Sequence, residues 1–371
     1  MKIFRCDHCG HPLFFENVQC LHCGSALAFF PEELTLASVT ATQEVGAFPG
    51  GLLRRQHPSG THGAASYRMC VNHERYGACN FAVAADDRNT LCISCRQTRM
   101  VPDLSLVANQ NRWRLIEAAK RRLFYTLAQL GLVSADGVSE PDQGPHYEFL
   151  ADIPGAPAIM TGHNAGLITL NIAEADDDER ARRRLALHEP YRTLLGHLRH
   201  ESGHFYWDKL ILGAGQVEAF RSVFGDESRD YAQALRDHYA ADHGSGGWQS
   251  SHVSAYASAH PWEDWAETWA HYLHMVDLLE TAAAFQTALV VPGGTAIAGE
   301  GVHDPFDSAT TDFDQLVSQW IPVTLMLNSM NRSLGQSDAY PFALSEGALA
   351  KLRFVHGAIR SARTPQVQSP G

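Results

Sequence analysis

The chain has 371 residues, 45% of them hydrophobic, and a formal net charge of -12 at pH 7. This length accommodates one catalytic domain with a full hydrophobic core plus one or two small modules. The negative charge argues against a general nucleic-acid binder, because neutralising phosphates requires a basic surface. Residues 1–105 also carry as many acidic as basic side chains, so they do not form a basic module.

The N-terminal residues lack the apolar core of a signal peptide, and no later stretch reaches the roughly 18 uninterrupted apolar residues of a membrane helix. We therefore expect a soluble, cytoplasmic protein that does not bind membranes. In a reducing compartment, its eight cysteines are better interpreted as metal ligands than as disulfides.

The cysteines fall into two groups of four near the N-terminus. Cys6, Cys9, Cys20 and Cys23 form two CxxC pairs separated by ten residues, each pair followed by a glycine that permits a tight turn. This spacing predicts a structural zinc ribbon over residues 1–30, which could also dock a protein partner. A redox-active CxxC would lack the βαβ context that such motifs need.

The second group is less regular and has a single CxxC. It consists of Cys70, Cys79, Cys92 and Cys95. We expect a second zinc-binding module over residues 66–102, with His73 as a spare candidate ligand. The alternative is that these thiols are only small buried apolar groups.

The remaining segments follow from composition and periodicity. Residues 31–65 are rich in Thr, Gly, Ala and Pro without a clear period, which is typical of a linker or a loosely packed arm. A domain boundary is expected near residue 103, with a catalytic domain over 103–363 and a disordered tail over 364–371. Helical spacing predicts helices over 109–130, 190–212, 261–285, 312–334 and 345–360, and residues 167–172 read as a short strand.

The sequence His200-Glu201-Ser202-Gly203-His204 is an HExxH motif. On a helix, His200 and His204 lie one turn apart and can bind one zinc ion, while Glu201 lies where a metal-bound water would sit. The motif can also occur by chance on a polar helix face.

A second predicted helix carries Glu263, Glu267, His271 and His274 on one face. Because a catalytic zinc needs three protein ligands and an open position, we assign Glu263 as the third ligand. Glu267 is assigned as an acceptor that orients a ligand histidine. A solvated acidic face is the alternative, but three neighbouring tryptophans make a fully exposed helix implausible.

Other third ligands are possible. A metzincin would need Gly at position 207 and His at position 210, where this chain has Trp207 and Leu210. Asp208 is interpreted as a support residue, although its carboxylate could reach the metal. His271 stays open as a ligand if the helix register differs.

Four segments carry a family resemblance: 189–201, 260–267, Cys92-Ile93-Ser94-Cys95-Arg96 and Tyr340-Pro341-Phe342. They resemble the corresponding parts of bacterial zinc-binding metallopeptidases that carry an N-terminal zinc ribbon. Residues 263–269 are also similar to the third-ligand helix of the anthrax lethal factor protease domain. That resemblance implies that Glu263 binds zinc. It also makes Tyr256, seven residues earlier, a candidate donor to the oxyanion.

The resulting expectation is an α+β protein with a mainly helical, zincin-like peptidase domain and a small sheet whose edge strand receives an extended peptide. It would use one catalytic and one or two structural zinc ions to hydrolyse peptide bonds, with Glu201 as general base. The alternative function is a zinc-ribbon adaptor that binds peptides without cutting them. A third possibility, nucleic-acid binding through the ribbons, is disfavoured by charge.

Overall fold

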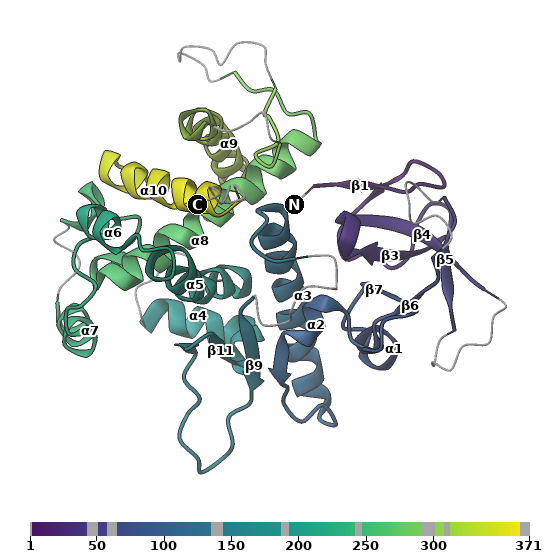
Figure 1. Ribbon diagram of the computed structural model, residues 1–371. Coiled ribbons are helices and arrows are strands. Elements are labelled where there is room, and N and C mark those ends of the chain that lie inside the picture. The colour runs from purple at the N-terminus through teal and green to yellow at the C-terminus, as the bar shows by residue number, and fades with distance from the viewer. Residues whose placement is uncertain are drawn as a thin grey trace, which may run out of the picture. The chain divides into compact units, whose positions relative to one another are not determined.

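The computed structural model in Figure 1 describes residues 2–42, 51–57, 65–134, 144–186, 193–241, 247–290, 301–307 and 312–363. Two compact units divide the chain. Unit 1 comprises residues 1–162 and 166–181, and unit 2 comprises residues 163–165 and 182–371. The predicted tail, 364–371, lies outside the described residues.

The N-terminal part of unit 1 is built on antiparallel strands. A two-stranded sheet pairs β1 with β2, and a five-stranded sheet has the order β3-β4-β5-β6-β7. Their bounds are Phe4–Arg5 (β1), Pro12–Leu13 (β2), Ala26–Phe30 (β3), Thr35–Ala41 (β4), Leu53–Arg55 (β5), Tyr67–Met69 (β6) and Ala82–Ala84 (β7). A short 3-10 helix, η1 (Pro31–Glu33), connects β3 to β4.

This sheet changes the interpretation of residues 31–65. The segment was expected to be a linker or loose arm, but its described part supplies β4 and β5. In β4 four consecutive residues, 36–39, are buried, so both faces of the strand are covered and the alternation that marks a half-exposed strand is absent. Ala37 and Val39 pack in one core cluster with Phe30 and Tyr67. Residues 43–50 and 58–64 lie outside the described part.

Helices α1 (Val71–Tyr76), α2 (Ile93–Arg96) and α3 (Val107–Gln129) also belong to unit 1. The end of α3 packs into the aromatic core of the cysteine modules, where Phe124 lies 5.8 Å from Phe81 and Tyr125 lies 5.7 Å from Phe15 between ring centroids. The helix predicted over 109–130 is therefore present, but it packs with the segment that precedes residue 103.

The other sheet has the strand order β10-β11-β9-β8. Its strands are β8 (Thr98–Met100), β9 (His146–Leu150), β10 (Gly162–Asn164) and β11 (Leu167–Asn171). β11 pairs in parallel with β9, and Ile168 and Leu170 are fully buried. The predicted strand at 167–172 is thus present, but it is an inner strand, and its expected role as the peptide-docking edge is wrong.

Unit 2 is built almost entirely of helices in its described residues (Figure 1). They are α5 (Leu194–Trp207), the π-helical turn η5 (Asp208–Leu212), α6 (Val217–Phe224), α7 (Tyr231–Ala240), η7 (Trp248–Ser250), η8 (Tyr256–Ser258), α8 (Pro261–Ala284), α9 (Phe313–Ser333) and α10 (Glu346–Arg363). Two further elements, η4 (Ile172–Ala175) and α4 (Asp177–Ala186), follow β11. An α+β fold with a mainly helical second part after four-cysteine modules confirms the predicted fold class.

Local sequence explains where the two central helices begin. Thr193 caps α5 because its hydroxyl oxygen accepts a hydrogen bond from the Gly196 N–H at 3.0 Å. Pro261 occupies the first turn of α8, where a missing N–H costs nothing. Residues 190–192, which were expected at the start of the first of these helices, lie outside the described part.

Helices α5 and α8 cross closely because one of them carries a glycine at the contact. A Cβ atom at Gly203 would lie 2.9 Å from the Ala266 Cα atom. At the same crossing, the Trp265 indole donates to the Gly203 carbonyl at 2.8 Å and the Trp269 indole donates to the Ser202 hydroxyl at 3.1 Å. The HExxH segment is thus held on α8 at several points.

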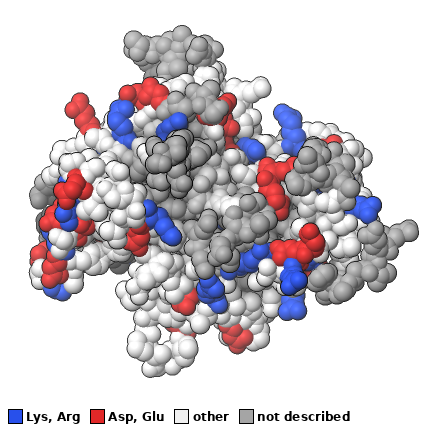
Figure 2. Space-filling model, in the orientation of Figure 1, with Lys and Arg blue, Asp and Glu red and all other residues white. Residues whose placement is uncertain are grey.

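On the face drawn in Figure 2, Lys and Arg side chains lie interspersed with Asp and Glu side chains. Exposed ion pairs such as Arg353–Asp314, at 2.5 Å, also bring opposite charges together at the surface. Among the described residues, no helix combines the length and apolar character needed to span a bilayer.

Candidate metal centre

The crossing of α5 and α8 brings His200, His204 and Glu263 together as buried residues whose ligand atoms all lie within 4.8 Å of one another. The Glu263 Oε2 atom is 3.0 Å from His200 Nε2 and 3.6 Å from His204 Nε2. Three ligands at about 2.0–2.1 Å from one tetrahedral ion would be separated by roughly 3.3 Å. The three side chains therefore have the spacing of a zinc ligand set.

Hydrogen bonding supports the same interpretation. Glu263 Oε2 is buried and has no hydrogen-bond partner of good geometry in the described part of the chain. An ionised carboxylate oxygen that faces two imidazole nitrogens without a satisfactory hydrogen bond is costly unless a cation lies between them. The donor set of two imidazoles and one carboxylate suits zinc.

The Nδ1 atom of His200, on the side of the ring away from Glu263, has its own hydrogen-bond partner. Glu267 Oε1 lies 2.7 Å from His200 Nδ1, and Ser254 donates its hydroxyl proton to Glu267 Oε2 at 2.6 Å. This arrangement leaves His200 Nε2 to face Glu263. Glu267 thus contacts the His200 nitrogen atom that does not face Glu263.

The other histidine has different neighbours. Between ring centroids, Trp262 lies 3.9 Å from His204, and His163 lies 6.1 Å from His204. His204 Nδ1 is buried and has no hydrogen-bond partner in the described part of the chain, a feature for which we have no physical account.

Glu201 lies beside the ligand histidines but outside the ligand cluster. Its Oε1 atom is 3.3 Å from His197 Nε2, and its Oε2 atom is buried and has no hydrogen-bond partner among the described residues. Burial raises the pKa of Glu201, but the His197 hydrogen bond and the nearby imidazoles outweigh it and lower the pKa overall. Glu201 is therefore an ionised proton acceptor with one oxygen available.

Two tyrosines lie next to the cluster, only one of which the sequence suggested. Tyr256, in η8, has its ring 5.9 Å from the His200 ring. Tyr231, at the start of α7, donates its hydroxyl proton to Glu263 Oε1 at 2.6 Å. Tyr231 was missed because α7 was not predicted and no motif marks it.

The alternative ligands lie elsewhere. His271 Nδ1 is 2.6 Å from the Tyr340 hydroxyl, and it does not belong to the ligand cluster. Asp208 directly follows α5 as the first residue of η5 and is also outside the cluster, and burial raises the pKa of its carboxyl group. His73, the spare candidate in the second cysteine group, lies with Nδ1 2.8 Å from the Cys79 carbonyl oxygen.

The eight cysteines form two compact clusters in unit 1. Within each cluster, all four sulfur atoms lie within 4.8 Å of one another, and the sulfur atoms of Cys6 and Cys23, like those of Cys79 and Cys92, are 3.7 Å apart. A tetrahedral zinc with bonds of about 2.3 Å separates its sulfurs by roughly 3.8 Å. All eight thiols are free, and both clusters fit four-thiolate zinc.

The two clusters differ in their surroundings. In the first, Cys9 and Cys23 are partly exposed, whereas all four cysteines of the second are buried. Arg121, which is buried, donates a hydrogen bond to the Ala78 carbonyl beside the second cluster. Burial lowers the pKa of Arg121, but the nearby Cys79 and Cys95 raise it overall, so this guanidinium offsets thiolate charge.

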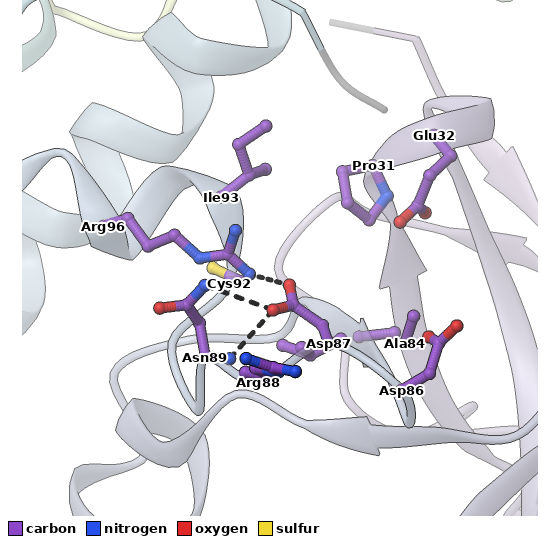
Figure 3. Close-up of a pocket in the computed structure, with 12 residues that line it drawn as sticks. Pro31, Glu32, Ala84, Asp86, Asp87, Arg88, Asn89, Cys92, Ile93 and Arg96 are labelled. Atoms are coloured by element: carbon purple, nitrogen blue, oxygen red, sulfur yellow. Dashed lines mark hydrogen bonds and ion pairs between the residues drawn. The ribbon is translucent and has the colours of Figure 1, made fainter. Parts of the chain in front are cut away.

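Unit 1 also contains a cavity of about 430 Å³ beside the second cluster, shown in Figure 3. Its lining comes from η1, β7, α2 and the loop between β7 and α2. The Arg96 guanidinium forms an ion pair with Asp87 there. Buried Arg68 donates to the carbonyls of Ala84 and Asp87, among others, and stabilises this loop.

Comparison with known proteins identifies the class. The chain belongs to the family described as "Putative zinc-binding metallo-peptidase", whose model matches residues 109–358, and a zinc-ribbon domain model matches residues 3–106. This confirms the predicted resemblance. The zinc-ribbon match ends at residue 106 and the peptidase match begins at residue 109, both close to residue 103. The two compact units instead divide the chain between residues 162 and 182.

Three mycobacterial proteins are similar over almost the whole chain. One uncharacterized protein of Mycobacterium bovis and one from each of two strains of Mycobacterium tuberculosis are 37% identical over 360 residues, which is 97% of this chain and 95% of each relative. No solved structure matches the chain.

Proposed function

We propose that the protein is a zinc-dependent peptidase of the gluzincin type, in which His200, His204 and Glu263 hold the catalytic ion. The observation that carries the proposal is the buried Glu263 Oε2 atom, 3.0 and 3.6 Å from the two histidine Nε2 atoms. Membership of a zinc-binding metallo-peptidase family supports the same reaction class.

When bound, the zinc ion would supply a more acidic water and polarise the scissile carbonyl. Glu201 is the proposed general base. Its carboxylate accepts a proton from the attacking water and returns it to the leaving amine, while His197, 3.3 Å away, orients it. Tyr256 is the proposed hydrogen-bond donor to the scissile carbonyl oxygen, which becomes negative in the tetrahedral intermediate. Its position beside the His200 ring supports this role.

The two cysteine clusters are proposed to hold one structural zinc ion each, so that the chain binds one catalytic and two structural ions. Structural zinc stabilises short segments that bury too little apolar surface to fold alone. The free thiols of these clusters fit a reducing compartment, so we propose a cytoplasmic location. The proposed substrate is a peptide or protein.

The test is Glu201→Gln, which preserves the shape of the side chain and removes its basicity. Wild type and variant are loaded with zinc, their metal content is measured, and each is incubated with a diverse peptide library analysed by mass spectrometry. We expect unchanged zinc content and a loss of cleavage of at least about 100-fold.

Glu218→Gln is the matched control, because Glu218 is 88% exposed on α6 and the same chemical change is made away from the centre. Unaltered cleavage by the Glu201→Gln protein would refute the assignment of the base. A zinc-loaded wild type that cuts no peptide but retains peptides would instead favour the adaptor function.

A further inference from the structure

The two carboxylate oxygens of Glu263 have different partners. Oε2 faces the imidazoles of His200 and His204, and Oε1 accepts a hydrogen bond from the Tyr231 hydroxyl at 2.6 Å. Because an ionised carboxylate can only accept, the proton of this bond belongs to Tyr231. The bond is therefore charge-assisted and orients the carboxylate.

Tyr231 is the tyrosine whose hydroxyl group contacts the candidate ligand Glu263 directly. Tyr256 lies beside His200 instead, with the two ring centroids 5.9 Å apart.

The helix that carries Tyr231 is largely exposed. Among the ten residues of α7 only Ala234 is buried, and Tyr231 itself is 37% exposed. The aromatic contacts of α7 run to the centre, with the Tyr231 ring 5.2 Å from His260 and 5.8 Å from Trp262. The His238 ring lies 5.8 Å from that of Tyr256.

From these observations we infer that Tyr231 is a positioning residue that holds Glu263 with Oε2 toward the metal and thereby couples the seating of α7 to metal occupancy. The inference rests on the proposed zinc site but does not require catalysis. Coupling between two sites is reciprocal, so zinc binding must stabilise α7 as much as a seated α7 strengthens zinc binding.

The distinction from a merely structural contact lies in this reciprocity. A tyrosine that only packed α7 against the rest of unit 2 would stabilise the helix equally with and without metal. A tyrosine that donates to a metal ligand is worth more when the ion is present, because the ion fixes the carboxylate in the orientation that Tyr231 selects.

The first measurement is the zinc affinity of the histidine–glutamate site in Tyr231→Phe, by competition with a chromogenic chelator on the full-length protein. Glu263→Ala defines the signal of the cysteine sites alone. We expect affinity to fall roughly 10–100-fold in Tyr231→Phe, as for other groups that orient metal ligands. Tyr256→Phe leaves the Tyr231–Glu263 hydrogen bond in place and should lose less, and an equal or larger loss there would overturn the role assigned to this bond.

The second measurement is hydrogen exchange of the α7 amides with the histidine–glutamate site empty or loaded and the cysteine sites filled throughout. Zinc should protect residues 231–240 in the wild type and much less in Tyr231→Phe. Tyr239→Phe is the matched control, since it removes a hydroxyl from the same helix at a side chain that is 57% exposed.

Unchanged zinc affinity together with unchanged zinc-dependent protection of α7 in Tyr231→Phe would overturn the inference. Failure of the wild type to bind zinc at the histidine–glutamate site would instead overturn the proposed function. The two failures are distinguished by the wild-type titration alone. Tyr231→Leu provides a second variant if the phenylalanine protein does not fold.

Discussion

Glu267 illustrates how a single side chain can support the centre without belonging to the ligand set. It accepts from Ser254 through one oxygen and lies 2.7 Å from His200 Nδ1 with the other. Its position could be predicted, because four-residue spacing places it on the same helix face as Glu263. The partner Ser254 could not be predicted, because it lies outside both helices and has no motif.

Replacing Glu267 with Ala should weaken zinc binding at the histidine–glutamate site roughly 10–100-fold, because His200 loses the acceptor that orients it. Chelator competition measures this, with the cysteine sites as internal reference. Glu218→Ala on α6 should leave the affinity unchanged. If Glu267→Ala binds zinc as tightly as the wild type, the carboxylate does not orient His200.

At the scale of elements, the centre depends on how closely α5 and α8 approach. Gly203 lies within the HExxH motif, and its missing side chain allows contact with the Ala266 backbone. The sequence identified the motif but gave no sign that its second variable position, Gly203, has a steric role. That role depends on the partner helix, which lies about sixty residues further along the chain.

Gly203→Ala should therefore lower the free energy of unfolding and weaken zinc binding. The added Cβ would lie 2.9 Å from the Ala266 Cα atom, and overpacking of this kind costs about 1–3 kcal/mol, more than the gain of about 1 kcal/mol in helix propensity. Urea unfolding and chelator competition measure the two effects.

The matched control is Gly357→Ala in α10, where an added Cβ meets nothing within 4 Å. This variant should gain about 0.5–1 kcal/mol in the free energy of unfolding and leave zinc binding unchanged. A Gly203→Ala protein that gained stability in the same way would contradict the close-crossing explanation.

At the scale of the whole molecule, two four-cysteine clusters with the same chemistry differ in access to solvent. The first contains partly exposed Cys9 and Cys23, whereas the second is fully buried with Arg121 nearby. Release of zinc to a chelator requires access to the sulfurs or local opening. The first cluster should therefore lose its zinc first.

A chelator should thus remove zinc from the full-length protein in separate phases. We expect Cys9→Ser to abolish a fast phase and Cys92→Ser to remove the slowest one. The measurement is the time course of chelator absorbance for wild type and both variants. If Cys92→Ser removed the fast phase instead, burial would not control release.

The sequence alone determined the candidate ligands, the candidate general base, the cysteine groupings and the major helices. Helical spacing of three and four residues and the spacing of CxxC pairs are local properties, so they can be recognised in the sequence without knowledge of the fold. Only the tertiary structure decided that β11 is an inner strand, that residues 31–65 contribute strands and that Tyr231 contacts Glu263. These features depend on residues distant in sequence, whose pairing is set by burial and hydrogen bonding across elements and leaves no local pattern.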